Sequence, residues 1–280
     1  MLQALGETNM KIVMLVENTV KDTKLKPKFG LSIYIETSKH KILLDLGPDD
    51  TYLHNARKMG IDLTEVDTVV LSHGHFDHGG GLASFININS KAKIYIHELA
   101  FEPHYLKILF LKKYAGLDKK LVGNERFIMI KDSIRIDDEL FLFSDVDGQL
   151  ETKNKRMLLK KTAHGYIQDD FKHEQSLIVT ESNKVVLFSA CSHRGIDNIL
   201  RSAQKHQPEI HFVFGGFHLY NPLTKTTEST EMIKKLAEEL ALQKCVFYTC
   251  HCTGKMAFEY MRKFMSDKLL FLSTGSIVDL

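Results

Sequence analysis

The amino-acid sequence predicts an α/β fold in which strands and helices alternate. Short apolar or β-rich segments that predict strands occur at residues 11–16, 31–36, 41–46, 67–71 and 92–96. Two stretches between them have helical composition: residues 51–59, which Gly60 closes, and a stretch that begins at 82–86. This repeated order of strand and helix is typical of layered α/β proteins. With 280 residues, 44% of them hydrophobic, the chain is long enough for one large core or two small ones.

The C-terminal half continues with strand-like and helical segments. Strands are predicted at 177–180, 184–189, 211–214 and 246–249, the first two as a hairpin-like pair. Between the last two strands, residues 230–241 have helical composition, with Met232, Leu236 and Leu240 four residues apart along one face. We expect these three side chains to belong to the core rather than to a binding surface.

The regular rhythm breaks between residues 97 and 160. Residues 105–114 are apolar with interspersed lysines, and residues 127–136 and 139–143 are β-like. We interpret 97–160 as an elaboration inserted in a single domain that spans 1–280. It would serve as a lid, a substrate-selecting cap or a dimerisation element over the active-site face. The alternative is a plain continuation of the scaffold.

The most specific chemical signal follows the predicted strand at 67–71. Three histidines and one aspartate fall within the run His73-Gly74-His75-Phe76-Asp77-His78, and three glycines follow it. Neutral imidazole and carboxylate suit zinc and its neighbours in the first transition row. Placed at the end of a buried strand, these side chains can converge on one ion or on two adjacent ions. The alternative is a polar loop in which histidines cluster by chance.

Composition disfavours several classes of protein. Lysine plus arginine exceeds aspartate plus glutamate by 37 minus 35, a net charge of +2, and no basic block stands out, so we expect no nucleic-acid partner. No stretch of about eighteen apolar residues occurs, so we expect no membrane-spanning segment. Four cysteines, three of them between positions 245 and 252, do not resemble a secreted disulfide framework. A reducing cytoplasm is therefore the expected location.

The motif H-x-H-x-D-H at residues 73–78 resembles the signature of the metallo-β-lactamase superfamily. Other segments agree with it, in order: GLS from residue 30, DLG from 45, SHGHFDHGGGL from 72, DDFKHEQSL from 169, ACSHRGIDNIL from 190, GGFHL from 215 and HCTG from 251. The combination is similar to a branch often labelled as resembling dihydropterin ribofuranosylaminobenzene phosphate synthase. The resemblance implies a four-layer αββα sandwich with metal ions at one edge, between the two sheets.

The resemblance also implies a set of metal ligands. For a first ion they are His73, His75 and His173. For a second ion they are Asp77, His78 and His251. The resemblance further implies an outer-shell role for Asp45, which would steady a ligand by a hydrogen bond. Alternatively, Asp45 is an ordinary aspartate in a turn at the end of a strand.

At one position the chain departs from the pattern of this family. Cys191 stands eighteen residues after His173, where family members often carry an aspartate that bridges both ions, and His193 follows two positions later. A thiolate at this position can bind zinc, because a bound metal keeps the cysteine deprotonated. We therefore predict Cys191 as the remaining ligand, with His193 as the alternative.

Two further groups lie close to the predicted ligands. His218 follows the strand at 211–214, where it would protonate the leaving group or contact the substrate; otherwise it is a core or surface histidine. Cys250 and Cys252 flank His251, and in an extended chain both would point away from the face that His251 uses. A separate thiolate site would need more ligands than this pair offers.

Together these features predict a metal-dependent hydrolase with two divalent metal ions, zinc first, with manganese or iron as alternatives. A metal-activated hydroxide would attack an ester, phosphoester, lactone or related bond of a small phosphorylated or heterocyclic metabolite. Asp77 and His218 are the predicted catalytic residues. The apolar surface of the elaboration is compatible with a homodimer.

Three other functions are weighed against hydrolysis. A diiron redox enzyme of this superfamily normally carries glutamate where this chain has His75, and it would need a flavin partner. A nuclease would show a basic groove or an added nucleic-acid module, and the near-neutral charge offers no support for either. A non-catalytic ligand-binding or sensor protein on the same fold would have no evident need for six aligned metal ligands.

Overall fold

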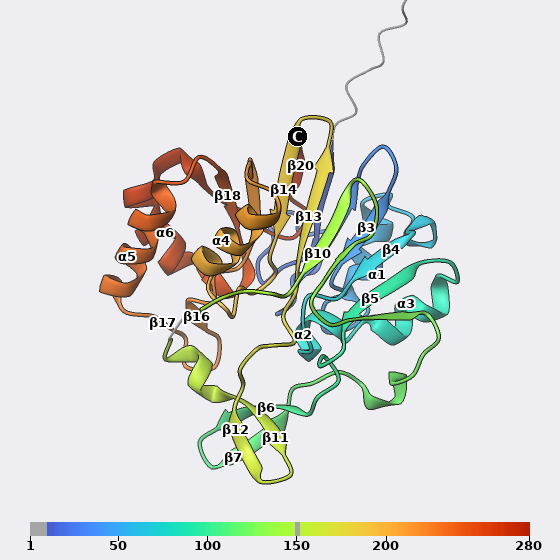
Figure 1. The fold of residues 1–280 in the computed structure, drawn as a ribbon, viewed down its shortest axis with the longest axis horizontal. Coiled ribbons are helices and arrows are strands. Elements are labelled where there is room, and N and C mark those ends of the chain that lie inside the picture. The colour runs from blue at the N-terminus through green and yellow to red at the C-terminus, as the bar shows by residue number, and fades with distance from the viewer. Residues whose placement is uncertain (1–9, 149–151) are drawn as a thin grey trace, which may run out of the picture.

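The computed structural model describes residues 10–148 and 152–280, and within them two seven-stranded sheets pack face to face (Figure 1). In spatial order the first sheet contains β20 (Ile277–Asp279), β1 (Lys11–Val16), β2 (Ser32–Glu36), β3 (Lys41–Leu44), β4 (Thr68–Val70), β5 (Lys93–His97) and β8 (Phe127–Ile130). The second contains β19 (Leu269–Phe271), β18 (Val246–Thr249), β15 (Phe212–Gly215), β14 (Lys184–Phe188), β13 (Ser176–Glu181), β10 (Leu140–Phe143) and β9 (Ser133–Arg135). The strands from β3 to β8 and those from β14 to β19 run parallel to their neighbours.

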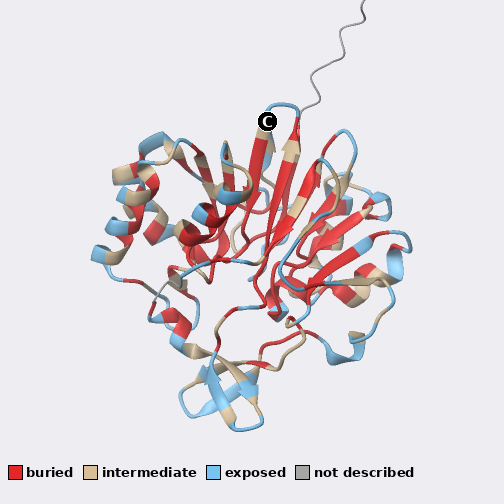
Figure 2. Cartoon of the chain, viewed as in Figure 1, coloured by how far each residue is buried: buried red, intermediate tan, exposed pale blue. Residues whose placement is uncertain are grey.

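Both faces of each sheet are buried, and the alternation of side chains along a strand explains how. On β1, Ile12 and Met14 pack into the core between the sheets, whereas Val13 and Leu15 pack on the outer face. The inter-sheet core also takes side chains from the second sheet, for example Phe188. Figure 2 shows this buried layer along the central strands. Apolar residues at successive positions therefore mark strands that are covered on both sides.

Helices cover the outer faces of the two sheets. The helices are α1 (Thr51–Lys58), α2 (Phe76–Gly79), α3 (Leu82–Ile88), α4 (Ile196–His206), α5 (Thr230–Ala241) and α6 (Lys255–Met265). Short 3₁₀ turns are η1 (Leu63–Glu65), η2 (Lys119–Leu121), η3 (Asn154–Met157), η4 (His251–Thr253) and η5 (Ser266–Lys268). Tyr52 of α1 and Phe85 of α3 pack on the first sheet, while α4, α5 and α6 pack on the second. The layers are thus helix, sheet, sheet, helix, and the predicted αββα sandwich is confirmed.

The predicted helix at 230–241 has the bounds of α5, and its apolar stripe lies against the second sheet. Leu236 and Leu240 are buried there, and Met232 is partly buried against the same cluster. Ser229 caps the helix by accepting a hydrogen bond from the backbone N–H of Met232. No helix in the described part of the chain combines the length and apolarity needed to cross a membrane.

A third, smaller sheet stands outside the sandwich, near the strand ends that carry α2 (Figure 1). Its strands, in spatial order, are β12 (Gly165–Gln168), β11 (Leu158–Thr162), β6 (His104–Ile108) and β7 (Leu111–Tyr114). A two-stranded ribbon, β16 (Tyr220–Asn221) with β17 (Thr226–Thr227), lies in the second half. Much of the small sheet is exposed to solvent (Figure 2). It supplies one wall of the pocket described below.

The small sheet and the predicted elaboration overlap only in part. Within 97–160, β8, β9 and β10 belong to the two large sheets, while β6, β7 and the start of β11 stand outside them. Residues 149–151 of that range lie outside the described residues. The division of 1–280 into one domain with an inserted cap therefore stays a prediction.

The β-like segment predicted at 127–136 is two strands rather than one. β8 joins the first sheet and β9 joins the second, with Lys131 and Asp132 between them. His97 binds the carbonyl oxygen of Lys131 through Nε2 at 2.8 Å, which helps to hold this crossing. A sequence pattern shows that a residue prefers extended backbone, but it does not show which sheet a strand will join.

Candidate metal centre

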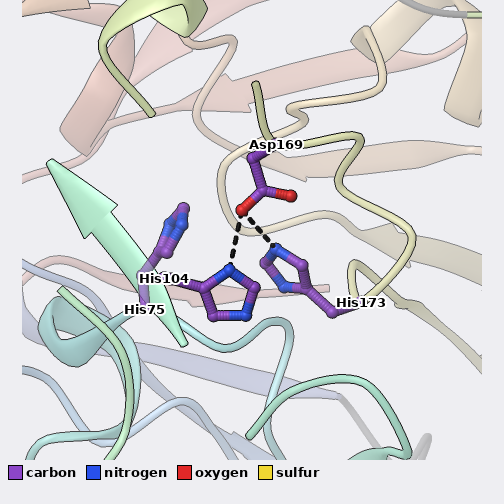
Figure 3. A group of neighbouring side chains, drawn as sticks. All are labelled: His75, His104, Asp169 and His173. Carbon is purple, nitrogen blue, oxygen red and sulfur yellow. Dashed lines mark hydrogen bonds and ion pairs between the residues drawn. The ribbon is translucent and has the colours of Figure 1, made fainter. Parts of the chain in front are cut away.

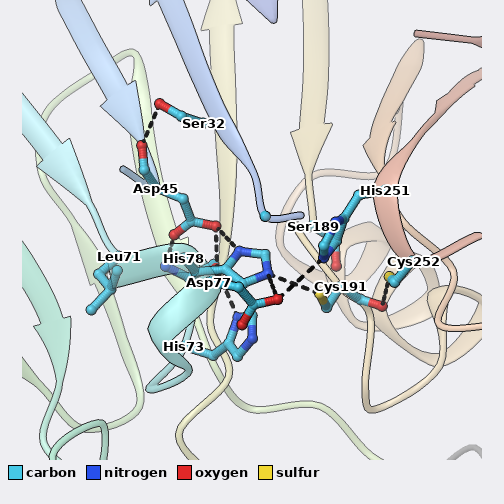
Figure 4. A network of polar contacts seen from close by, with 12 residues as sticks. Ser32, Asp45, Leu71, His73, Asp77, His78, Ser189, Cys191, His251 and Cys252 are labelled. Atoms are coloured by element: carbon cyan, nitrogen blue, oxygen red, sulfur yellow. Dashed lines mark hydrogen bonds and ion pairs between the residues drawn. The ribbon is translucent and has the colours of Figure 1, made fainter. Parts of the chain in front are cut away.

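The predicted ligands gather at one edge of the sandwich, where strands of both sheets end. The run at 73–78 follows β4, Cys191 and His193 follow β14, and His218 and His251 follow β15 and β18. β14, β15 and β18 are parallel neighbours, so their carboxyl ends meet at the same edge. Segments that are far apart in the sequence thereby converge (Figure 4).

Asp45 forms hydrogen bonds that hold the predicted ligands at residues 73–78, called here the ligand run, in place. Its Oδ1 accepts a hydrogen bond from the backbone N–H of Ser72 at 2.8 Å, and its Oδ2 accepts one from the Ser72 hydroxyl at 2.7 Å. The same Oδ2 lies 2.6 Å from Nδ1 of His78, and both side chains are fully buried (Figure 4). This is the hydrogen bond from Asp45 to a predicted ligand that the sequence led us to expect.

The hydrogen bonds of three histidines leave one nitrogen of each facing the centre. The Ser72 hydroxyl donates to Asp45, so Nδ1 of His73, 2.8 Å from that hydroxyl, must be the donor in its own contact. Nδ1 of His78 likewise donates to Asp45, and Nδ1 of His251 donates to Oδ1 of Asn18 at 2.9 Å. In its neutral form each ring therefore presents the lone pair of Nε2, which is the group that binds a metal ion once the proton has left.

One group of donors surrounds Asp77. Its Oδ2 lies 3.6 Å from Nε2 of His78 and 3.6 Å from Nε2 of His251. The Sγ atom of Cys191 lies 3.1 Å from Nε2 of His78. Burial alone would lower the pKa of His78, but the carboxylates of Asp45 and Asp77 raise it to about 9. This part of the centre therefore favours positive charge.

A second group of donors consists of His73, His75 and His193. Their donor atoms lie within 4.8 Å of one another, and Nε2 of His73 is 3.3 Å from Nε2 of His193. Burial, together with the neighbouring histidines, holds the pKa of His73 and of His193 well below the usual range. Both rings are therefore neutral, the form in which histidine binds metals. Glu174 positions the loop of His193 by accepting its backbone N–H at 2.7 Å.

His173, the ligand predicted to complete the first ion, is placed differently. Its Nδ1 accepts a hydrogen bond from the backbone N–H of Gly74 at 2.9 Å, so its hydrogen is on Nε2, which points to Asp169 at 3.4 Å (Figure 3). Neither nitrogen then has a free lone pair for an ion. The geometry therefore favours His193 as the third ligand beside His73 and His75. From the sequence, His193 was predicted only as an alternative to Cys191.

The network around His173 includes two residues that the sequence did not single out as functional. Nδ1 of His104 donates to Oδ2 of Asp169 at 2.7 Å, and Oδ1 of Asp169 accepts the backbone N–H of Phe171 at 2.9 Å. Burial raises the pKa of Asp169, but its hydrogen bonds with His104 and His173 outweigh this effect and hold that pKa well below its usual range. Asp169 opens the motif DDFKHEQSL, which was a usable signal. His104 has no local signal, because it lies alone in an apolar segment.

Gly74 is required by close packing beside this network. A Cβ atom on Gly74 would lie 2.2 Å from the carbonyl oxygen of Ala100 and 2.9 Å from Nε2 of His104. Any larger residue would push the ligand run away from β6 and from His173. The glycine between the first two histidines therefore has a packing reason.

Cys252 corrects the expectation that the cysteines beside His251 point away from the site. The chain does not stay extended after β18 but turns into η4, so Cys252 faces the pocket together with Cys191 and His251. The Sγ atom of Cys252 accepts the backbone N–H of His218 at 3.3 Å. Burial raises the pKa of the Cys191 thiol well above its usual range, and the neighbouring Cys252 raises it further.

His218 lines a pocket of about 310 Å³ together with five of the candidate ligands, His75, Asp77, Cys191, His193 and His251. The ring of His218 packs against that of His193, with centroids 4.3 Å apart, and neither of its nitrogens has a hydrogen-bond partner among the described residues. The backbone of His218 adopts a left-handed φ of 51°, which turns the chain at the end of β15. His218 is thus placed beside the centre, where its side chain is available to a bound molecule.

The residues present fit divalent cations. The donor set is imidazole, carboxylate and thiol, which suits zinc and its first-row neighbours. Besides the three Nε2 lone pairs, the described part of the chain leaves Nε2 of His75, which belongs to the group with His73 and His193, buried without a partner. Buried polar atoms normally have partners, so unpartnered nitrogens that converge on one place indicate a site for cations.

Comparison with known proteins identifies a matching family and relatives of this chain. The model of the metallo-β-lactamase superfamily matches residues 25–161. The 7,8-dihydropterin-6-methyl-4-(β-D-ribofuranosyl)-aminobenzene-5′-phosphate synthase of Methanocaldococcus jannaschii is 29% identical over 288 residues, which cover 95% of this chain and 96% of the relative. An uncharacterised protein of the same organism is 28% identical and covers 87% of this chain and 90% of its own length.

Solved structures extend the likeness to the whole chain. Tm1679, described as a metal-dependent hydrolase of the β-lactamase superfamily, superposes with a TM-score of 0.79 and 26% identity, covering 97% of this chain and 99% of its own. The Zn²⁺-bound PqqB from Methylobacterium extorquens has a TM-score of 0.58 at 13% identity, covering 96% of this chain and 100% of its own. The second likeness concerns the fold alone.

Proposed function

We propose that this protein, which belongs to the metallo-β-lactamase superfamily, uses two divalent cations to hydrolyse an ester, phosphoester, lactone or related bond of a small molecule. The proposal depends on one observation, the meeting of two groups of donors in one pocket. The first group is His73, His75 and His193, and the second is Asp77, His78 and His251. The Sγ atom of Cys191 lies close to donor atoms of both groups.

Divalent cations bound there would polarise a substrate oxygen and lower the pKa of water toward about 7. The chain's own residues supply the remaining functions. Asp45 fixes the ring of His78, and Asn18 fixes that of His251. The free nitrogens of His218 are placed to deliver a proton to the leaving group. We propose that the small sheet acts as a cap that limits the entry of water.

Zinc is the ion that we propose first, with manganese or iron as alternatives. The donor set contains six histidine and carboxylate ligands and one thiol, and it contains no glutamate at the position of His75. This favours hydrolysis over diiron redox chemistry. We propose a small molecule rather than nucleic acid as the substrate, and a homodimer stays a prediction.

The name of one relative raises a second candidate. That relative is called a synthase, and its product name joins an aminobenzene ring to a ribofuranosyl phosphate and a dihydropterin. A synthase reaction on a related aromatic substrate is compatible with a pocket that holds Phe29, Tyr114 and Tyr220 near the centre. Hydrolysis is preferred because the ligand groups themselves are built for activating water.

The test pairs metal analysis with turnover. Protein purified without added metal would be analysed for zinc, manganese and iron, and then assayed with bis(p-nitrophenyl) phosphate and a panel of lactones. We expect about two zinc or manganese ions per chain and a loss of turnover in Asp77→Ala. The matched control is Asp138→Ala, whose carboxylate is exposed and pairs with Lys39.

Other outcomes of these measurements would support a different function. Two irons with no hydrolysis would support the redox enzyme, and bound zinc with no turnover of any substrate would support the sensor or the synthase. Absence of metal even after reconstitution would contradict the metal centre itself.

A further inference from the structure

The pocket at the metal centre has two unlike sides. On one side lie polar groups: the half-buried His218 and the buried candidate ligands His75, Asp77, Cys191, His193 and His251. The other side is made by the small sheet and the turn before it, with Leu106, Ile108, Met157 and Leu158. A molecule that fills the pocket therefore contacts polar side chains at one end and apolar side chains at the other.

The register of the small sheet explains why its apolar side chains face inward. Leu106 and Ile108 are two residues apart on β6, so they share a face, and Lys107 between them points to the other side. Leu106 pairs with Leu158 of β11 and with Lys113 of β7, which places all three on the same face. This face of the small sheet is thus apolar where it meets the pocket.

Charge is scarce on the apolar side. Among the described residues that line the pocket, Lys113 is the only lysine and no arginine is present. The buried Lys155, whose charge helps to lower the pKa of His193, lies over the ring of Phe171 and is not part of the lining. Phosphate groups in proteins are usually held by several cationic side chains, by arginine forks or by backbone N–H groups at the start of a helix. A single lysine beside an apolar wall would bind the phosphate group of a substrate only weakly.

We propose that the substrate of this site is an uncharged ester or lactone whose apolar body lies against Leu106, Ile108 and Leu158, with its scissile carbonyl at the metal centre. The inference rests on the proposed hydrolase function and narrows its substrate class. It favours an acyl chain or other hydrocarbon body over the phosphorylated metabolite predicted from the sequence. The pocket volume of about 310 Å³ is at the lower end of the range for small-molecule sites.

The test is a homologous series of p-nitrophenyl esters: acetate, butyrate and hexanoate. Each methylene that contacts the apolar wall should raise kcat/KM by about fourfold, so the four methylenes from acetate to hexanoate should raise it by roughly 250-fold. In Leu106→Asn the ratio of hexanoate to acetate turnover should fall by about tenfold or more. The matched control, Lys107→Asn on the opposite face of β6, should keep the wild-type ratio.

A second measurement does not need turnover or a variant. Binding of hexanoate and acetate to the metal-free wild-type protein would be compared by calorimetry, and hexanoate should bind at least tenfold more tightly. Measurable ester hydrolysis with no dependence on chain length, or equal binding of the two acids, would overturn this inference while leaving the hydrolase function intact. Faster turnover of bis(p-nitrophenyl) phosphate than of any ester would also overturn it. No hydrolysis of any substrate by the metal-loaded protein would contradict the proposed function and this inference together.

Discussion

Oδ2 of Asp45 lies 2.6 Å from Nδ1 of His78, and neither side chain has any exposure to solvent. The two residues come from different strand ends, since Asp45 follows β3 and His78 lies in α2. The same carboxylate also accepts both the backbone N–H and the hydroxyl of Ser72. One buried aspartate therefore determines the orientation of the whole ligand run and the tautomer of one ligand.

This relationship predicts a loss of metal affinity without a loss of ligands. Asp45→Asn removes the charge that orients His78 and should weaken metal binding by about tenfold to a hundredfold. Competition with a chromophoric chelator would measure the change. Asp49→Asn, in the same loop between β3 and α1 and half exposed, is the matched control and should bind metal like the wild type. Unchanged affinity in Asp45→Asn would show that the contact is only structural.

The two candidate histidines of the first ion can be separated by substitution. His193→Ala should lower the metal content by about one ion per chain, because its ring faces His73 at 3.3 Å. His173→Ala should keep both ions, because its nitrogens are taken by Gly74 and Asp169. Metal analysis of both variants after dialysis against the same chelator would decide. The reverse result would restore the ligand set implied by the sequence.

Asp169 should matter more for stability than its neighbour in sequence. Asp169→Asn leaves buried donors of His104, His173 and Phe171 with a poorer acceptor, and should lower the free energy of unfolding by about 1–3 kcal/mol. Asp170→Asn loses only partly exposed ion pairs, with Lys160 and Lys172, and should cost about 1 kcal/mol or less. Urea unfolding of the two variants side by side would measure the difference, and equal losses would contradict the assigned role of Asp169.

His40 should make part of the stability depend on pH. Burial lowers the pKa of His40, but Asp67 and Asp137, at 3.0 and 2.6 Å from its two nitrogens, raise it above the ordinary 6.5. Because the pKa of His40 is higher in the folded state than the ordinary 6.5, protonated His40 stabilises the fold. This contribution to the free energy of unfolding is fully present below pH 6.5 and is lost as pH rises through the folded-state pKa.

The corresponding variant is His40→Asn. Its deficit in the free energy of unfolding relative to the wild type should be largest in mildly acidic buffer and should shrink as pH rises above 6.5. Urea unfolding across this range would measure it. His54→Asn, at a partly buried histidine of α1, is the control, and a deficit for His40→Asn that does not change with pH would refute the prediction.

Much of the fold follows from local pattern, and the exceptions have clear causes. The predicted strand at 11–16 and helix at 230–241 have the bounds that the structure shows, because apolar spacing and a capping serine determine them locally. β11 and β12 were missed because their residues are mixed in polarity and half exposed, which leaves little periodic signal. The helices α4 and α6, which cover the second sheet, were also not predicted.

The candidate site likewise contains residues that the sequence pattern could identify and residues that it could not. The run at 73–78 could be found because its ligands are close in sequence. His104 could not, because its importance arises only from contact with Asp169, 65 residues away. Cys252 could not be placed either, because whether it faces the pocket depends on a turn at η4 that the sequence pattern does not reveal.

The sequence by itself determined the layered α/β class, the chemistry of the donors and their location at the ends of strands, since these follow from residue type and local spacing. Only the tertiary structure decided which histidine nitrogens remain free for metal, because that depends on where each hydrogen is used. Gly74 and Asp169 take the nitrogens of His173, whereas the hydrogen bonds of His73, His78 and His251 leave Nε2 bare. A hydrogen bond between residues distant in sequence is a property of the folded chain alone.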